Sequence, residues 1–371
     1  MKKVFVMLVA LSFAVFGMAQ GEACTADIPS EGYLNPLISA VPSLGIGADA
    51  AAGGLADMGV ATKGDINSQF WNSSKYAQMK SQGGFTFNYS PWLTNLGVSD
   101  VHLVSAAGYY NISEAAGAVS TSLRFFSLGD VTLRQSLEDI GYTVSPYEFA
   151  FDLGYSRILA ENFSMGVVLR LVASDLSAKQ DENYRTGYAF AADINGFYDL
   201  PIDTKRGTDF FRFGFNIQNL GTKISYDGGI TKNFLPLALR LGVSYQVAIN
   251  EYNRISVHAE ANRMMVPSRY SRFTEGYDPN DEGTWAMTQK EYNNLSVMQG
   301  LGYSWADAPY GAKEEIKEFN WALGAEYSYN EQFFARLGYN NESKIKGNRK
   351  YFTFGAGFQL SGFKIDVGYV L

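Results

Sequence analysis

Residues able to do catalytic chemistry are few in this 371-residue chain, and their settings do not favour it. Ser361 and Lys364 match the Ser-x-x-Lys spacing in which a lysine activates a serine nucleophile, but they fall at a tight turn between two expected strands. His258 alternates with Ser256 and Glu260 and offers acid–base chemistry, yet no activated nucleophile accompanies it. We interpret the serine motif as coincidence and the histidine as a hydrogen-bonded contact, and we expect no enzymatic activity.

Metal-ligating residues are equally sparse. One cysteine excludes an intramolecular disulfide and a cysteine metal cluster, and two histidines leave little room for a histidine site. The oxygen-bearing side chains at 278–283 have a spacing suggestive of calcium ligands, although a solvated acidic turn is the default interpretation. We therefore expect no resident metal and no cofactor, and we keep calcium at 278–283 as an open alternative.

The first residues predict export from the cytoplasm. Two lysines precede an apolar stretch that ends at Phe16, and small residues then lead to a cleavage site after Ala19. Residues 1–19 are expected to be a signal peptide, since a membrane-spanning helix needs roughly 20 apolar residues and this stretch is shorter. Lipid attachment at Cys24 is a weaker alternative, because Glu22 stands where the motif prefers a small or apolar residue.

The balance of residue types points to a β-protein in a membrane. Charged residues make up only 18% of the chain and aromatic residues 15%, whereas about a quarter of the residues of a soluble domain are charged. Such a composition suits an apolar belt flanked by aromatic girdles. Without Lys2 and Lys3 the chain has 28 basic and 37 acidic residues, which argues against nucleic acid as a partner because phosphate binding needs a basic surface.

Apolar and polar residues alternate over long stretches of the chain. Along 235–250, one face holds only Leu, Val, Tyr and Ile, and the other holds Pro, Ala, Arg, Gly, Ser, Gln and Asn; 211–218 and 319–330 repeat the pattern. A period of two predicts β-strands. The polar faces carry mostly small residues and isolated charges, which fits a crowded barrel lumen better than the solvent face of a soluble sandwich. A closed sheet also leaves no unpaired edge in hydrocarbon.

Turn residues divide the chain into thirteen expected strands, joined by alternating short and long connections. The strands are expected at 84–91, 100–111, 116–127, 147–158, 162–174, 186–199, 209–220, 236–250, 253–263, 318–330, 332–341, 350–360 and 362–371. Because short turns face the periplasm in bacterial barrels, the long connections are expected outside the cell. Such barrels have an even strand number. We therefore predict an all-β, transmembrane antiparallel barrel of fourteen strands over 83–371, with its last strand beyond Leu371.

Charges of both signs recur on the polar faces of these strands. An unpaired charge in a crowded lumen is costly, so we expect the arginines and acids to form ion pairs inside the barrel. The expected lumen charge network consists of Arg124, Arg170, Arg212 and Arg240 on the basic side, and Asp152, Asp193, Glu260, Glu326 and Asp366 on the acidic side.

Residues 20–82 precede the barrel and do not alternate. The small residues from Gly45 to Thr62 are suited to packing inside a narrow lumen, so this segment is expected to be a plug. The Asp49-x-x-x-Gly-Gly stretch and the later Trp71-Asn-Ser motif resemble the start of the barrel proteins related to the fatty-acid transporter FadL, with Ser where that family commonly has Pro.

Two further motifs make the resemblance more specific. Ser90-Pro-Trp-Leu and Arg124-x-Phe-Ser-Leu-Gly are similar to elements of the PorV family of the Bacteroidetes type IX secretion system, and the likeness runs from about Leu37 to the end. Members of that family have fourteen strands, which agrees with the even number expected here. The resemblance implies an outer-membrane carrier and not a catalyst.

The resemblance also implies partners. They are the type IX translocon, the C-terminal signal domains of secreted cargo, and the sortase-like proteins that attach cargo to the cell surface. Phospholipid and lipopolysaccharide of the outer membrane would surround the barrel. The alternative function is a FadL-like transporter of a hydrophobic small molecule such as a long-chain fatty acid, which requires an apolar internal pocket and a lateral exit.

The connection 264–317 is far longer than joining two strands requires. Loops of this length are usually functional or disordered, and disordered segments are poor in aromatic residues, whereas this one is rich in them. Aromatic side chains are also enriched at binding hot spots. We expect an extracellular docking surface anchored by Tyr270, Phe273, Tyr277, Trp285 and Trp305; the alternative is a lid whose aromatics form a small core.

Overall fold

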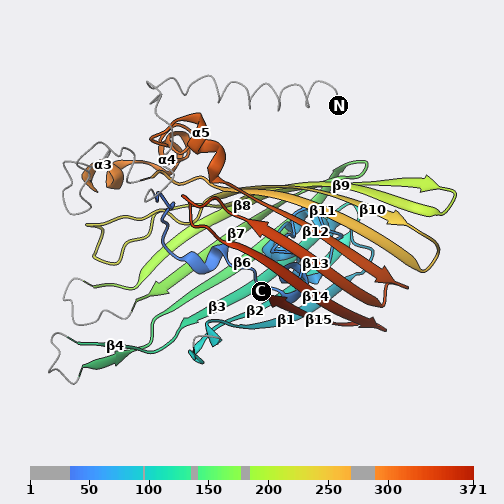
Figure 1. Ribbon diagram of the computed structural model, residues 1–371, viewed down its shortest axis with the longest axis horizontal. Helices are drawn as coiled ribbons and strands as arrows, with labels where there is room; N and C mark the ends of the chain where they lie inside the picture. Colours follow the sequence, from blue (N-terminus) through green and yellow to red (C-terminus); the bar gives the residue numbers. More distant parts are fainter. Residues whose placement is uncertain (1–33, 95–96, 135–140, 177–183, 269–288) are drawn as a thin grey trace.

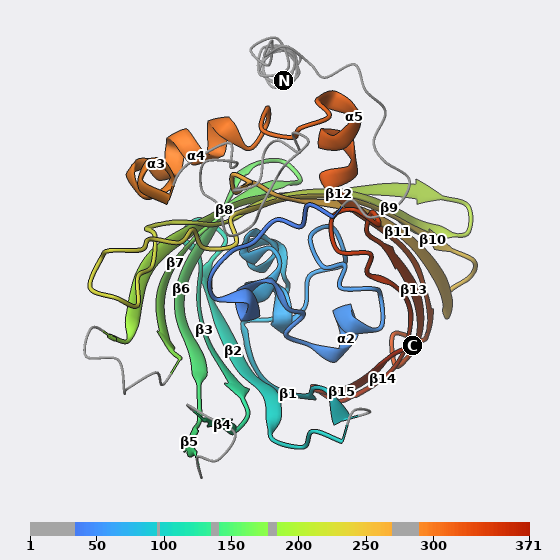
Figure 2. The same cartoon turned by 60° about the vertical axis from the view of Figure 1, so that its left-hand side comes forward.

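The computed structural model describes residues 34–94, 97–134, 141–176, 184–268 and 289–371. Within these ranges, an antiparallel sheet of thirteen strands curls around a central segment of the same chain, as Figures 1 and 2 show. The predicted all-β barrel architecture is confirmed. The expected signal peptide 1–19, Cys24 and the acidic stretch 278–283 lie outside the described residues.

The thirteen strands of the sheet follow one another in chain order. They are β1 (Gly83–Pro91), β2 (Val101–Ser113), β3 (Gly117–Leu128), β6 (Tyr147–Ala160), β7 (Phe163–Asp175), β8 (Gly187–Thr204), β9 (Gly207–Gly221), β10 (Ala238–Ala248), β11 (Asn253–Met264), β12 (Phe319–Tyr329), β13 (Phe333–Asn341), β14 (Lys350–Leu360) and β15 (Phe363–Val370). Each coincides with an expected strand. The small hairpin of β4 (Val131–Leu133) and β5 (Tyr142–Val144) was not predicted, because strands of three residues are too short to show alternation.

Side chains along each strand alternate between the lumen and the outer surface. On β10, Arg240 and Ser244 are 6% and 2% exposed, whereas the intervening Leu241 and Val243 are 38% and 42% exposed. The outward-facing residues of the neighbouring strands are likewise Phe, Tyr, Leu, Val and Ile. A continuous apolar surface of this kind is stable against lipid, as expected for a barrel that crosses the outer membrane.

The two ends of the barrel differ in their connections. At one end the strands are joined by turns of two to four residues, and at the other by loops of eight residues or more. We call these the short-turn end and the long-loop end. Asn162 and Asn330 adopt positive φ angles of 62° and 54° in the short turns, a conformation that asparagine tolerates better than most residues.

Strands β1 and β15 form the two edges of the sheet. They run in the same direction, because every pairing between them along the sheet is antiparallel. Within the described ranges no hydrogen-bonded pairing joins one edge to the other. The fourteenth strand stays a prediction.

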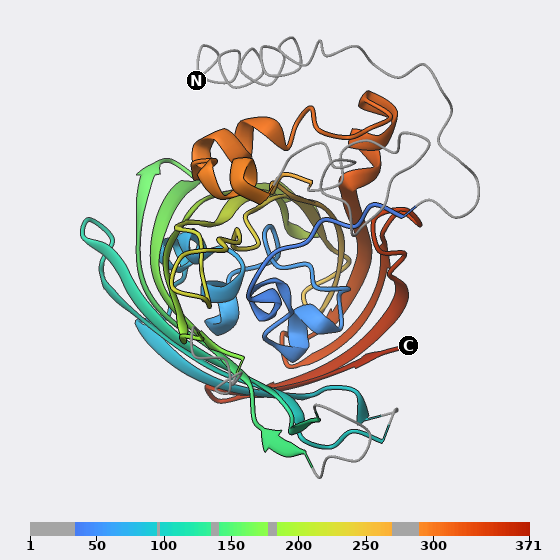
Figure 3. The same ribbon diagram turned by 90° about the vertical axis from the view of Figure 1, so that its left-hand side faces the viewer.

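Residues 34–82, the described part of the expected plug, lie inside the ring of strands (Figures 2 and 3). They contain four short helices: η1 (Pro42–Gly45), α2 (Ala50–Gly53), η2 (Ile66–Phe70) and η3 (Ser73–Gln78). The side chain of Asp49 accepts a hydrogen bond from the Ala52 N–H and so caps α2. A Cβ on Gly54 would lie 2.7 Å from the Cα of Gly355 on β14, so this close approach to the wall requires glycine.

The long loop between β11 and β12 carries the remaining helices. These are α3 (Gln289–Asn294), α4 (Val297–Tyr303), α5 (Ala312–Glu315) and η6 (Ile316–Glu318), and together we call residues 289–318 the cap. Figure 1 places the cap at the long-loop end. None of the helices in the described part of the chain is long and apolar enough to cross a bilayer.

Candidate functional site: the plugged lumen and the cap

The strand register places opposite charges next to each other in the lumen. Arg170 lies directly opposite Asp152 on the neighbouring strand, and its Nε is 2.8 Å from Asp152 Oδ1. Its Nη2 is 3.0 Å from Asp193 Oδ2, and all three side chains are buried. Two acids and one arginine thus hold β6, β7 and β8 together on their lumen side.

A second ion pair connects the wall to the plug. Arg240 Nη1 is 3.2 Å from Glu260 Oε1. The other oxygen of Glu260 accepts hydrogen bonds from the backbone N–H groups of Gly59 and Val60, at 3.0 Å and 3.1 Å. The guanidinium of Arg240 lies 4.8 Å from the ring centroid of Trp71. This pair therefore anchors the plug to the wall.

Two of the expected arginines have other partners than expected. Arg124 donates to the backbone carbonyls of Ser43 and Ile46 at the end of η1, at 2.6 Å and 3.1 Å. Arg212 pairs at 3.0 Å with Asp199, which lies directly opposite it on β8.

The last two expected acids pair with Arg336, which lies outside the expected network. Glu326 and Asp366 each lie 2.6 Å from a nitrogen of Arg336. Arg336 stands directly opposite Glu326 in the register of β12 and β13. Arg336 lies on the polar face of β13, so the alternation of polar and apolar residues along this strand could have identified it.

The Trp71-Asn-Ser motif locks the plug to several strands. Trp71 Nε1 donates to Asp49 Oδ2 at 2.5 Å, and its backbone carbonyl accepts from Asn216 on β9 at 2.7 Å. Asn72 Nδ2 donates to the carbonyls of Val60 and Gly196 at 2.9 Å. Because these bonds are buried, displacing the plug would leave several polar groups unpaired in the lumen.

A cavity of about 1110 Å³ is lined by residues of the plug together with residues of several strands and long loops. Its lining is mixed: Leu37, Ile38 and Trp92 are apolar, whereas Arg240 and Arg349 are charged. Residues of both sheet edges, β1 and β15, also contribute to it.

The cap has an apolar core that joins it to the barrel rim. Buried Tyr292 of α3 packs edge-on against Phe234 at a centroid distance of 5.3 Å, and Lys223 lies 4.1 Å from the Phe234 ring. Trp305, one of the expected anchors, is half-buried and lies 4.0 Å from the Arg263 guanidinium. It therefore contributes to the cap–barrel contact. The other expected anchors, Tyr270, Phe273, Tyr277 and Trp285, lie outside the described residues.

Three large apolar side chains of the cap instead point to solvent. Met298 is 64% exposed, Tyr303 52% and Ile316 65%. We call them the exposed cap residues. The sequence alone did not distinguish them from core residues, because helices this short have no clear apolar face.

The residues considered for catalysis are engaged elsewhere or isolated. Ser361 sits in a two-residue turn with a φ of 48°, and the amine of Lys364 lies 3.4 Å from Asp366. His258 is buried, but neither ring nitrogen has a hydrogen-bond partner among the described residues, so the expected hydrogen-bonded contact is wrong. Its cross-strand neighbours are Ser244 and Gly324, and neither brings a polar atom within reach.

Comparison with known proteins gives the family. The family model described as "Type IX secretion system protein PorV" matches residues 31–271. A search of curated proteins finds no match. Two crystal structures of the Pseudomonas putida toluene transporter TodX align with TM-scores of 0.48 and 0.46, both at 10% identity. They cover 91% and 87% of this chain and 93% and 91% of theirs. Because the family match spans more than half of the sequence, the chain belongs to the PorV family of type IX secretion system proteins.

Proposed function

We propose that this protein is a non-catalytic carrier of the outer membrane that binds the C-terminal signal domains of cargo as they leave the type IX translocon. It then passes the cargo to sortase-like attachment proteins at the cell surface. Membership of a family of secretion components, and not of enzymes, supports the general role. The lipid-facing belt of the barrel supports a place among the phospholipid and lipopolysaccharide of the outer membrane.

The observation that carries the proposal is the cap. Its inward-facing aromatic residue Tyr292 is buried in the apolar core between cap and barrel rim. Met298, Tyr303 and Ile316, in contrast, remain exposed to solvent. Exposed apolar side chains on a folded element outside the lipid are costly in water and are typical of protein-binding surfaces. The expected anchors Tyr270, Phe273, Tyr277 and Trp285 belong to the same loop and remain part of the proposed surface.

The plug supports a surface role over transport through the lumen. Ser68, Asn72 and Tyr76 are fully buried between the plug and the wall, and the Glu260 and Trp71 contacts fix the plug from two sides. A carrier that binds its cargo at the cap needs no passage through the barrel. The plug then serves to keep the outer membrane sealed.

The test replaces the exposed cap residues Met298 and Tyr303 by serine in the full-length protein in cells. The matched control replaces Ile249 and Tyr252, which are 44% and 54% exposed at the short-turn end. The cap variant should reach the outer membrane in normal amount but co-purify with much less cargo and attachment protein, whereas the control should behave like the wild type. Equal recovery of cargo by both variants would contradict the proposal.

A second candidate function rests on the cavity of about 1110 Å³. Ligand pockets for small molecules are commonly 300–1,000 Å³ and largely apolar, and Leu37, Ile38 and Trp92 give this one an apolar side. A transporter of hydrophobic molecules would carry lipid or fatty acid there after mild purification. Mass spectrometry of the native barrel distinguishes the two functions, since a carrier of cargo needs no such ligand.

A further inference from the structure

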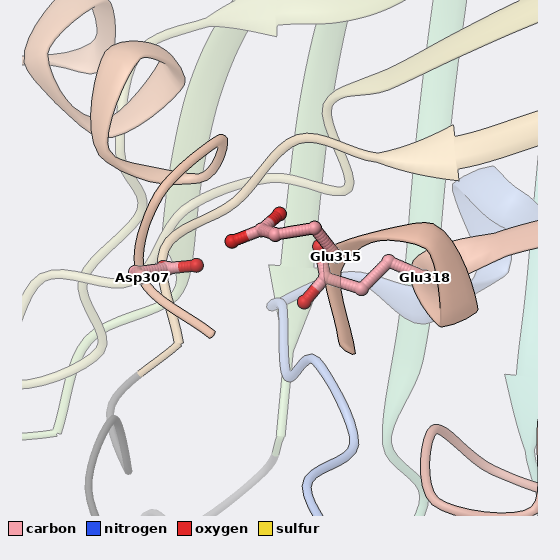
Figure 4. Close-up of side chains that lie close together, drawn as sticks. All are labelled: Asp307, Glu315 and Glu318. Carbon is pink, nitrogen blue, oxygen red and sulfur yellow. The ribbon is translucent and has the colours of Figure 1, made fainter. Parts of the chain in front are cut away.

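Charged groups, most of them buried, hold the cap against the barrel, and this feature does not depend on the proposed function. Arg263 is the second-last residue of β11, and Lys346 lies in the loop between β13 and β14. The acids come from the cap, and the close-up in Figure 4 shows three of them turned toward one another. We call the whole set the junction: Arg263, Lys346, Asp307, Glu314, Glu315 and Glu318.

Most of the junction is paired. Lys346 Nζ lies 2.7 Å from Glu314 Oε1 and 2.9 Å from Glu318 Oε1. Arg263 Nη2 lies 2.9 Å from Glu318 Oε2 and also contacts Glu315. The two cations thus bridge three acids of α5 and η6, and the cap is held against two different parts of the barrel rim.

Asp307 lies beside this group, and no described cation forms an ion pair with it. Its Oδ2 accepts a hydrogen bond from the Ser268 N–H at 2.6 Å, but its Oδ1 is buried and has no hydrogen-bond partner within the described ranges. Carboxylate oxygens of Asp307, Glu315 and Glu318 all lie within 4.8 Å of one another. Burial, and then the nearby charge of Glu318, raises the pKa of Asp307 well above its ordinary value of 3.8.

The charges at the junction do not cancel. Among the described residues, Asp307, Glu315 and Glu318 meet two cations, Arg263 and Lys346, so full ionisation would leave an excess of negative charge in a largely buried place, which is expensive. The neutral groups that face it from the plug and the rim are the amide of Asn35, which donates to Glu314 at 2.9 Å, and the backbone of Ser268. Lys313 and Lys317 of the same helices are exposed on the outer side.

We propose that the junction is a proton-dependent latch, in which Asp307 holds a proton while the cap is docked and shares it with the carboxylate of Glu315 or Glu318. The proton removes one negative charge and gives the buried Oδ1 of Asp307 a hydrogen bond to make. The docked cap is therefore favoured where Asp307 is protonated, and raising the pH loosens it.

The direction follows from linkage between protonation and docking. An acid whose pKa is higher in the docked state binds its proton more tightly there, so docking is strongest below the ordinary pKa of 3.8. Docking then weakens as the pH rises toward the raised pKa, by up to about tenfold in the docking equilibrium per pH unit. Above the raised pKa it changes no further.

Hydrogen–deuterium exchange of the full-length barrel in lipid nanodiscs tests the latch. Protection factors of residues 289–318 should fall between pH 5 and pH 9 in the wild type, while those of the strands stay constant. The Asp307→Asn variant keeps the shape and removes the charge, so its cap should be protected equally at both pH values. Glu291→Gln removes an exposed carboxylate of the same cap and should retain the wild-type dependence.

Three results would overturn the latch. One is cap protection in the wild type that does not change with pH, or that falls at low pH. Another is an Asp307→Asn cap that retains the wild-type dependence. The third is protection at pH 9 that millimolar Ca²⁺ restores and chelation at pH 7 abolishes, because a metal ion and not a proton would then balance the charge. Should Asp307→Asn fail to fold, Glu315→Gln removes a neighbouring negative charge that raises the pKa of Asp307, so it is expected to move the loss of protection to lower pH.

Discussion

Replacing Glu260 by alanine tests whether the lumen charges exist to hold the plug. The change leaves Arg240, whose side chain is 8% exposed, without its acid, and it leaves the N–H groups of Gly59 and Val60 without their acceptor. Removing one partner of a buried ion pair costs about 3–5 kcal/mol. At roughly 1.4 kcal/mol per factor of ten, the plug around these residues should open on the order of a hundredfold to a few thousandfold more often.

The assay is hydrogen–deuterium exchange of residues 57–62 in lipid nanodiscs, with the barrel strands as internal reference. Lys63→Ala is the matched control, because Lys63 also links plug to wall, through Glu331 at 3.1 Å, but both side chains are more than half exposed. Exposed pairs are worth about 0–1 kcal/mol, so the control should change exchange by less than about tenfold. If Glu260→Ala leaves the exchange of 57–62 unchanged, or if both variants have the same effect, the plug is not held by this pair.

Three further substitutions probe other contacts. Gly54→Val places side-chain atoms against Gly355 and should loosen the plug by about 1–3 kcal/mol in the same exchange assay, whereas Gly53→Ala, which meets no atom within 4 Å, should not. Arg336→Met leaves Glu326 unpaired and Asp366 with Lys364 alone. A loss of about 3–5 kcal/mol should lower the temperature at which the barrel loses its folded band in detergent gels, and an unchanged temperature would refute the role of Arg336. Tyr292→Ala leaves a cavity in the cap core at a cost of about 3–5 kcal/mol. Proteases should therefore cut the cap faster, while the melting temperature of the barrel stays unchanged. Equal destabilisation of cap and barrel would mean that the two unfold together.

The strands were predictable because lipid on one side and a crowded lumen on the other impose strict alternation. The expected strand 236–250 and the observed β10 share the same inward and outward faces. Ion-pair partners were harder to predict, since they depend on the register between strands. Arg212 faces Asp199 because β8 and β9 are aligned there, and no property of either segment alone fixes that alignment.

The plug and cap contacts were the least predictable part. Arg124 donates to the Ser43 carbonyl of η1, which is far from it in the chain. No periodic pattern in the sequence predicts such a contact. In the cap, aromatic content indicated a folded loop, but whether a ring points inward, as Tyr292 does, or outward, as Tyr303 does, is decided by tertiary packing. The tripeptide strands β4 and β5 were below the length at which alternation is visible.

Site-specific photo-crosslinking at Tyr303 tests the central claim, that cargo binds at the cap, most directly. A photoreactive amino acid is placed at Tyr303 of the cap and, in a separate strain, at Tyr252 of the short-turn end; the two side chains are similarly exposed, at 52% and 54%. In cells secreting cargo, the probe at Tyr303 should capture the cargo signal domain and the probe at Tyr252 should not. Capture of cargo at Tyr252 alone, or at neither position while secretion proceeds normally, would contradict the account.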